Sequence, residues 1–136
     1  MISSILSCRK KVNQNLPLGC CNAHSKIKFS SFVLTTKKYN NCCYIEENNA
    51  MHIVCISNIG YYREIPIIIG KKFTNISMLP NYPCDSRNLG IYVVADLSAL
   101  QMWPVSLIKN KAFQMYFGND STYLVLPLLH NEFNLN

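Results

Sequence analysis

Hydrophobic residues along this chain fall into short runs of β-branched and aromatic residues that Pro, Gly and Asn interrupt. Such runs are typical of strands, whereas amphipathic helices need apolar residues repeated every three or four positions. Ala and Glu, which favour exposed helix positions, are scarce. The pattern predicts strands at residues 26–34, 51–57, 65–69, 72–78, 91–95, 112–117 and 122–126.

The connections between these runs carry turn signals of different kinds. Gly118, Asn119 and Asp120 separate the last two strands and tolerate positive φ, which predicts a hairpin with a bulge. Residues 79–88 are proline-bearing and predict a loop. A helix over residues 98–111 is also expected, with Pro104 either in its first turn or at a break.

The length and composition fit one folded unit. A chain of 136 residues has the size of a single domain, and its 49% hydrophobic residues supply material for a core. We therefore predict a small single domain that is mainly β or α+β. The abundance of Asn, Ile, Lys, Tyr and Phe leaves another interpretation open, a loosely folded chain from an orphan or recently arisen reading frame.

Positive charge is concentrated at the N-terminal end. Residues 1–45 contain seven Lys or Arg and no Asp or Glu, while residues 46–136 contain six basic against seven acidic residues. This distribution predicts a flexible basic arm over residues 1–45 and a near-neutral hydrophobic body over residues 46–136. The cations that would bind an acidic partner are Arg9, Lys10, Lys11, Lys26, Lys28, Lys37 and Lys38.

The same cations leave the class of acidic partner open. An acidic protein surface is the first candidate, and nucleic acid or anionic lipid headgroups are alternatives. Four aromatic residues of the arm would stack on exposed bases if nucleic acid were the partner, namely Phe29, Phe32, Tyr39 and Tyr44.

The cysteine pattern argues for a reducing compartment. Seven cysteines are an odd number, and four of them form the neighbouring pairs Cys20–Cys21 and Cys42–Cys43, which rarely bridge to each other. The apolar residues 2–6 precede the basic residues 9–11, an order opposite to that of a secretory signal. We predict an intracellular protein of the cytoplasm or nucleus. A mitochondrial presequence fits less well because the arm uses Lys where presequences favour Arg.

Two half-sites carry the sharpest metal hypothesis. Two residues separate Cys21 from His24, and two residues likewise separate His52 from Cys55. Two such pairs would complete a tetrahedral Cys2His2 zinc site. The gap between the pairs is longer than in common zinc fingers, and other cysteines would compete as ligands.

Motifs of enzymes are not found in the sequence. The five glycines assemble neither a dinucleotide-binding cluster nor a phosphate-binding loop, and there is no nucleophile-elbow pattern. The longest uncharged stretches are shorter than the 18 or so residues of a membrane-spanning helix. We predict a non-enzymatic protein of interaction or regulation, with a body that is poorly soluble without its arm.

Overall fold

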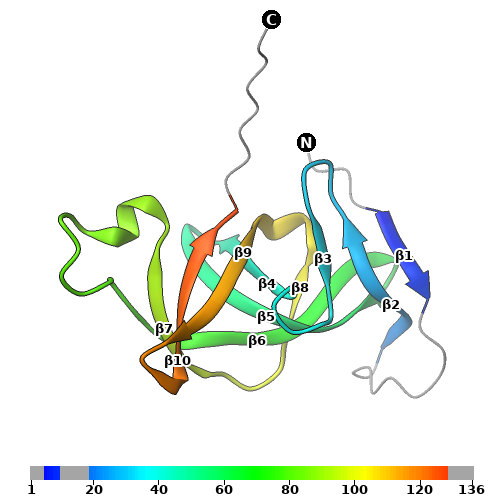
Figure 1. The fold of residues 1–136 in the computed structure, drawn as a ribbon. Helices are drawn as coiled ribbons and strands as arrows, with labels where there is room; N and C mark the ends of the chain where they lie inside the picture. The colour runs from blue at the N-terminus through cyan, green and yellow to red at the C-terminus, as the bar shows by residue number, and fades with distance from the viewer. Residues whose placement is uncertain (1–4, 10–18, 129–136) are drawn as a thin grey trace, which may run out of the picture.

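The fold is an antiparallel sheet, seen in a computed structural model that describes residues 5–9 and 19–128 (Figure 1). The described residues form ten strands: β1 (Ile5–Arg9), β2 (Cys20–Lys28), β3 (Val33–Thr35), β4 (Cys42–Glu47), β5 (Ala50–Tyr62), β6 (Ile65–Ser77), β7 (Tyr92–Leu97), β8 (Gln101–Pro104), β9 (Ile108–Phe117) and β10 (Asn119–Pro127). Two 3-10 turns, η1 (Ser86–Leu89) and η2 (Val105–Leu107), are the helical elements of the described part. The prediction of a mainly β domain is confirmed.

Six of the strands close a ring. Their order is β4–β5–β6–β7–β10–β9, and β9 pairs back with β4. With 13 residues each, β5 and β6 extend beyond the ring, where the second half of β5 pairs with β2 and the first half of β6 pairs with β8. Figure 1 shows β7 and β10 at one end of the molecule and β1 and β2 at the other.

The ring encloses one hydrophobic cluster and rests against a second. The inner cluster has buried members from each of the six ring strands: Cys42, Tyr44, Ile53, Phe73, Val94, Ala112 and Val125. The outer cluster lies between the opposite faces of β4 and β5 and the added strands β2, β3 and β8, with Ile27, Leu34, Ile45, Val54 and Trp103 among its members. Alternation along β4 and β5 divides the apolar residues of these two strands between the clusters.

Two tight turns make the hairpins that begin and end β5. Asn48 and Asn49 between β4 and β5 both have positive φ, 52° and 63°, which is the backbone of a type I′ turn. Arg63 and Glu64 between β5 and β6 also have positive φ, 49° and 67°, although neither residue type favours it. The Arg63 guanidinium lies 5.2 Å from the centre of the Tyr62 ring.

Gly70 allows β5 and β6 to approach closely where the ring turns. A Cβ at this position would collide with the main-chain oxygen of Cys55. The register of the two strands shifts beside it, between Ile56 and Asn58. A glycine is therefore required by the bend of the sheet rather than by a turn.

The predicted helix over residues 98–111 is wrong. The segment forms β8, η2 and the start of β9. Pro104 lacks a backbone N–H and cannot continue a helix, and Trp103, Val105 and Ile108 are all buried in the outer cluster. Their spacing suits an irregular extended segment rather than one face of a helix.

The predicted strands are confirmed in type but not always in extent. Residues 51–57, 112–117 and 122–126 lie within β5, β9 and β10, and residues 91–95 overlap β7. The stretches 65–69 and 72–78 belong to the single strand β6, whereas residues 26–34 include the turn between β2 and β3. The hairpin at Gly118 is confirmed, with a register shift between Asn119 and Tyr123.

The sheet runs across the boundary expected at residue 45. Ile27, Leu34 and Ile45 are fully buried, and they lie in β2, β3 and β4 respectively. Residues 19–45 therefore share the hydrophobic clusters of residues 46–128.

No helix among the described residues has the length and hydropathy needed to cross a membrane.

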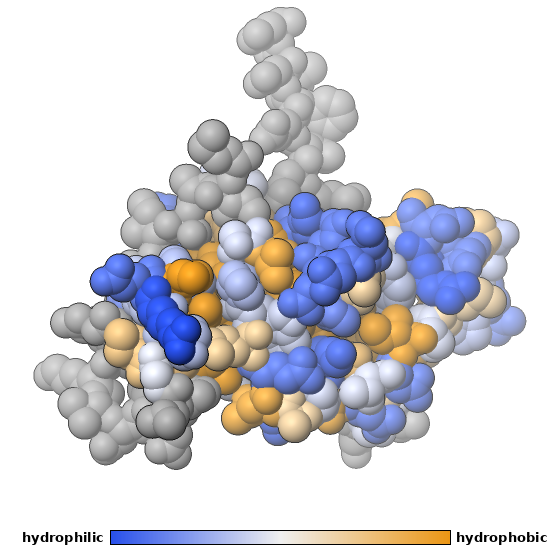
Figure 2. All heavy atoms as spheres, turned by 180° about the vertical axis from the view of Figure 1, so that it is seen from behind, coloured by the Kyte–Doolittle hydropathy of each residue, from blue (hydrophilic) through white to orange (hydrophobic). Residues whose placement is uncertain are grey.

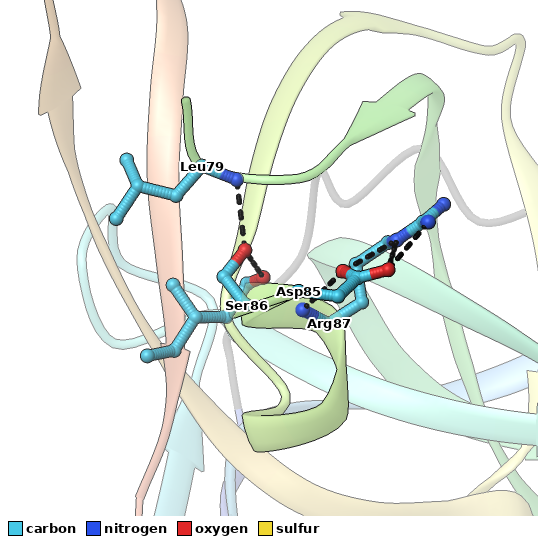
Figure 3. A network of polar contacts seen from close by, with 5 residues as sticks. Leu79, Asp85, Ser86 and Arg87 are labelled. Atoms are coloured by element: carbon cyan, nitrogen blue, oxygen red, sulfur yellow. Dashed lines mark hydrogen bonds and ion pairs between the residues drawn. The ribbon is translucent and has the colours of Figure 1, made fainter. Parts of the chain in front are cut away.

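A buried serine fixes the long connection between β6 and β7 (Figure 3). The Ser86 hydroxyl accepts a hydrogen bond from the Leu79 N–H at 2.8 Å and donates one to the Ile91 carbonyl at 3.0 Å. Asp85 caps η1 by accepting from the Arg87 N–H at 3.0 Å, and its carboxylate pairs with the Arg87 guanidinium at 2.7 Å. The predicted loop at 79–88 is thus an ordered connection containing most of η1.

Candidate functional site

Hollows at the two mouths of the ring are the candidates for a functional site. On the face drawn in Figure 2, hydrophilic and hydrophobic areas alternate and no single apolar area dominates. The inner cluster reaches both mouths, because Cys55 and Phe73 line one hollow and Tyr44 lines the other. The two hollows differ in chemistry.

The first hollow is a cavity of about 430 Å³ beside the connection between β6 and β7. Tyr44 lines this cavity and donates a hydrogen bond to the Gly90 carbonyl at 2.7 Å. Burial raises the pKa of Tyr44, so this hydroxyl stays neutral. Glu46 and Lys109 at the rim are already paired, with Oε2 and Nζ 3.6 Å apart.

The second hollow is a larger and more polar cleft of about 710 Å³. Hydroxyl, amide, thiol and charged side chains predominate in its lining: Thr36, Lys38, Asn41, Cys55, Ser57, Asp96, Gln114, Ser121 and Tyr123, with Ile56, Phe73 and Leu97 as the apolar members. This variety of donors and acceptors makes the cleft the stronger candidate for binding or chemistry.

A cluster of aromatic rings around one lysine forms the rim of this cleft. We call it the tyrosine–lysine patch, and it consists of Lys38, Tyr39, Tyr116 and Tyr123. The Lys38 ammonium donates a hydrogen bond to the Tyr116 hydroxyl at 3.1 Å and lies 5.3 Å from the ring centres of both Tyr39 and Tyr116. Tyr116 stacks on Tyr123 with ring centres 5.1 Å apart. Tyr39 and Tyr116 are 45% and 53% exposed, so the patch offers ring surface to a partner.

The contact between lysine and tyrosine sets the charge of the patch. The hydrogen bond from Lys38 lowers the pKa of Tyr116, and the same hydrogen bond raises the pKa of Lys38. Each shift favours the charged form of its group. Lys38 therefore remains a cation at physiological pH.

The turn between β3 and β4 holds Lys38 at the rim. Asn40 donates its N–H to the Lys37 carbonyl at 3.0 Å, and Lys37 donates its N–H to the Thr35 hydroxyl at 3.1 Å. Tyr39 adopts a φ of 72°, an unusual conformation for an aromatic residue. The Lys111 ammonium ties the turn to β9 by donating to the Val33 carbonyl at 2.9 Å and the Asn40 amide oxygen at 3.1 Å.

Two thiols lie opposite each other on the inner face of the ring. Cys42 of β4 pairs with Cys55 of β5. Burial and a hydrogen bond between the two thiols shift the pKa values of both groups. That hydrogen bond raises the pKa of Cys42, which is fully buried, and lowers the pKa of Cys55, which lines the cleft. The charge of Lys38 also lowers the pKa of Cys55.

The surroundings of Cys55 and Cys43 differ. The Cys55 thiol donates to the Gln114 amide oxygen at 3.8 Å, and Lys71 of β6 is its opposite neighbour on the other side. Cys43 follows Cys42 but belongs to the outer cluster, where burial raises its pKa. Successive residues of a strand face opposite sides, so neighbouring Cys42 and Cys43 are separated by the sheet itself.

The structure keeps the two expected zinc half-sites apart. His24 pairs with Ile59 of β5, which lies four residues beyond Cys55 and seven beyond His52, roughly 13 and 23 Å along an extended strand. His52 and Cys55 also face opposite sides of β5. Cys21 is exposed on β2, opposite Tyr61.

The two histidines of the expected zinc site contact other side chains. His24 meets the Tyr61 ring edge-on at 5.9 Å, and the His52 Nε2 lies 3.9 Å from the Glu47 carboxylate. In the described part of the chain, no three His, Cys, Asp or Glu residues form a group that could hold a metal ion. A zinc ion shared by all four residues would need a different arrangement of β2 and β5, and the zinc hypothesis stays a prediction.

The basic residues expected to bind an acidic partner are divided among several places. Lys37 and Lys38 lie together in the turn between β3 and β4, beside the cleft. Lys26 and Lys28 lie on one face of β2, and Arg9 lies on β1 opposite His24. Lys10 and Lys11 fall outside the described residues.

Two of the four aromatic residues expected to stack on bases are buried. Phe29 and Tyr44 are only 5% and 4% exposed, and Phe29 stacks on Phe32 with ring centres 4.5 Å apart. Tyr39 is the exposed member of the four. Sequence reasoning missed Tyr116 and Tyr123, which are separated from Lys38 by about eighty residues of chain, and the Cys42–Cys55 pair, whose members lie on different strands.

Comparison with known proteins identifies a family for this chain. The family model described as a domain of unknown function (DUF8592) matches residues 9–128, which include every strand from β2 to β10. The chain therefore belongs to this family. No curated protein and no solved structure matches it significantly.

Proposed function

We propose that this DUF8592 domain is a non-enzymatic binding module that recognises an acidic segment of a protein partner at the tyrosine–lysine patch. The observation that carries the proposal is the position of Lys38 between the exposed rings of Tyr39 and Tyr116. Among the described residues, Lys38 makes no ion pair with a carboxylate. Its charge is thus available to a ligand.

The chemistry of the patch suits a carboxylate attached to a peptide. The Lys38 ammonium and the Tyr116 hydroxyl, 3.1 Å apart, supply two polar groups that one carboxylate can engage together. The flanking rings supply apolar area at low entropic cost, as tyrosines do at many protein interfaces. Asp96 in the wall of the same cleft would repel a second carboxylate and so orient the segment.

A reducing, intracellular compartment belongs to the same proposal. All six cysteines with described side chains carry free thiols: Cys20, Cys21, Cys42, Cys43, Cys55 and Cys84. Reducing compartments keep thiols in that state.

Single-stranded nucleic acid is a second candidate, favoured by the stacked pair of Tyr116 and Tyr123. Their ring centres lie 5.1 Å apart, and the exposed Tyr116 could extend the stack onto a base. Phosphates would then replace carboxylates beside Lys38.

The test measures binding of a fluorescent polyglutamate peptide and, separately, a fluorescent oligothymidylate to the full chain. Lys38→Ala should weaken polyglutamate binding roughly two- to fivefold, because an exposed ion pair contributes up to about 1 kcal/mol. Rising salt should weaken it further. Lys109→Ala is the matched control, since it removes the same charge at the opposite mouth of the ring.

The outcomes separate the candidates. Equal losses for Lys38→Ala and Lys109→Ala would mean that net charge alone attracts the peptide, contrary to the proposal. Tighter binding of oligothymidylate that depends on the Tyr116 ring, lost in Tyr116→Ala and kept in Tyr116→Phe, would establish the nucleic-acid candidate instead.

A further inference from the structure

We propose that Cys42 and Cys55 form an oxidisable dithiol in the wall of the cleft, which hydrogen peroxide converts into a cross-strand disulfide. The proposal is independent of the ligand assigned to the tyrosine–lysine patch. It rests on the register of β4 and β5, on the burial of the two thiols and on the opening of the cleft at one of them.

The register brings the two cysteines to the spacing that a disulfide needs. The Ile56 N–H donates to the Asn41 carbonyl at 2.8 Å, so the hydrogen bond lies just beyond the Cys42–Cys55 pair rather than within it. Opposite residues of such a non-hydrogen-bonded pair have Cα atoms about 4.5 Å apart. Disulfides span Cα separations of about 4.4–6.8 Å, so the backbone can keep its register on oxidation.

The backbone beside the pair is fixed. The Asn41 side-chain amide donates to the Ile56 carbonyl at 3.0 Å, which adds to the main-chain hydrogen bond between the same two residues. Cys43 and Val54 continue the register on the other side of the pair. Two thiols held in this way meet without a loop closure at the moment of reaction.

The two sulfurs differ in access, which assigns their roles. Cys55 lines the cleft and is partly exposed, whereas Cys42 is fully buried behind it. The hydrogen bond from Cys42 and the charge of Lys38 lower the pKa of Cys55, which favours its thiolate. Cys55 is therefore the thiol that peroxide oxidises, and Cys42 is the thiol that resolves the product.

The reaction balances in two steps. The Cys55 thiolate attacks one oxygen of hydrogen peroxide, an S–O bond forms and the O–O bond breaks, and the departing hydroxide takes up a proton to become water. The Cys42 sulfur then attacks the Cys55 sulfenic acid, so that an S–S bond forms and the S–O bond breaks. The hydroxide that leaves combines with the Cys42 proton to form a second molecule of water. Two molecules of a small thiol of the glutathione class reverse the process. The first attacks one sulfur of the S–S bond and forms a mixed disulfide, and the second displaces the protein thiol, so that both cysteines are reduced and the two small thiols leave as their own disulfide.

Other cysteines are placed less well for this reaction. Cys43 faces the outer cluster, and Cys84 lies exposed in the connection between β6 and β7. Cys20 and Cys21 are neighbours along β2, which disfavours a bridge between them. Oxidation of the described cysteines should therefore begin at Cys55.

The test treats the reduced full chain with stoichiometric hydrogen peroxide, blocks the remaining thiols and maps the linked peptides by mass spectrometry. The wild-type protein and the Cys84→Ser control should give a Cys42–Cys55 link that a thiol reductant removes. Cys42→Ser should stop at a sulfenic acid on Cys55, trapped by dimedone, and Cys55→Ser should give neither product.

Contrary outcomes are equally definite. The proposal fails if peroxide links other cysteines first, or if Cys42 and Cys55 stay reduced while exposed thiols are oxidised. Should Cys42→Ser or Cys55→Ser fail to fold, the peptide map of the wild-type protein and of Cys84→Ser still decides between these results.

Discussion

Where the chain leaves the sheet, side-chain hydrogen bonds satisfy backbone groups that would otherwise pair with a neighbouring strand. Ser86 is fully buried, and its hydroxyl connects the Leu79 N–H with the Ile91 carbonyl, the two ends of the connection between β6 and β7. An N–H that is shielded from water and left without an acceptor costs more than the net gain from a typical hydrogen bond. Ser86 is therefore required for its oxygen rather than for its small size.

Ser86→Ala should lower the free energy of unfolding by about 1–3 kcal/mol, because it leaves the part-buried Leu79 N–H and the Ile91 carbonyl without this partner. Urea unfolding followed by far-ultraviolet circular dichroism measures the change. Ser77→Ala is the matched control, since the Ser77 hydroxyl reaches the Val93 carbonyl at 3.4 Å on an exposed part of β6. Equal and small effects of both substitutions would contradict the role assigned to Ser86.

At the scale of elements, the N-terminal strands complete the sheet instead of standing apart from it. β4 pairs with both β5 and β9, and therefore closes the ring. β2 and β3 contribute Ile27 and Leu34 to the outer cluster. Residues 20–45 are basic in composition, yet Ile27, Leu34 and Ile45 are fully buried, as are core residues of the later strands.

A fragment of residues 46–136 should be insoluble or aggregated. It lacks β2, β3 and most of β4, so the ring opens between β5 and β9 and uncovers Val54 and Ile108. Unpaired edges with apolar faces associate readily. Size-exclusion chromatography with light scattering measures the outcome.

The control for this experiment begins at residue 19 and keeps β2 to β10. We expect the control to be soluble, because both hydrophobic clusters are intact. A soluble and monomeric 46–136 fragment would show that β4 is dispensable for closing the ring.

At the scale of the whole molecule, two hydrophobic clusters join the strands from β2 to β10. The inner cluster joins all six strands of the ring, and the outer cluster joins β2, β3 and β8 to it. Burial on this scale stabilises a domain of ordinary size without a metal ion. Of the basic residues in the first 45 positions that the structure describes, Arg9 lies on β1, Lys26 and Lys28 lie on β2, and Lys37 and Lys38 lie in the turn between β3 and β4.

We expect a chelator to leave the thermal unfolding midpoint unchanged, because His24 and Cys55 are roughly 13 Å or more apart along the sheet. The measurement compares unfolding of the full chain in chelator and with one equivalent of zinc. A midpoint that falls in chelator, together with loss of bound metal in Cys55→Ser but not in Cys84→Ser, would establish the zinc hypothesis and overturn this expectation.

What the sequence determined by itself is local. Alternating apolar residues predict most of the strands, and Gly118 with its neighbours predicts the final hairpin, because these signals depend on the conformations of adjacent residues. The same local signals predicted one strand where β2 and β3 are separated by a turn, because that turn lacks glycine. They also predicted two strands in place of β6, because β6 contains a glycine.

Only the tertiary structure decided which strands become neighbours. Period-two alternation tells which face a residue takes, but it does not specify the partner strand or the register. Cys42 meets Cys55, and Lys38 meets Tyr116, because β5 and β9 both pair with β4. The cleft, the tyrosine–lysine patch and the dithiol all arise from this closure of the ring, which depends on contacts between residues far apart in the sequence.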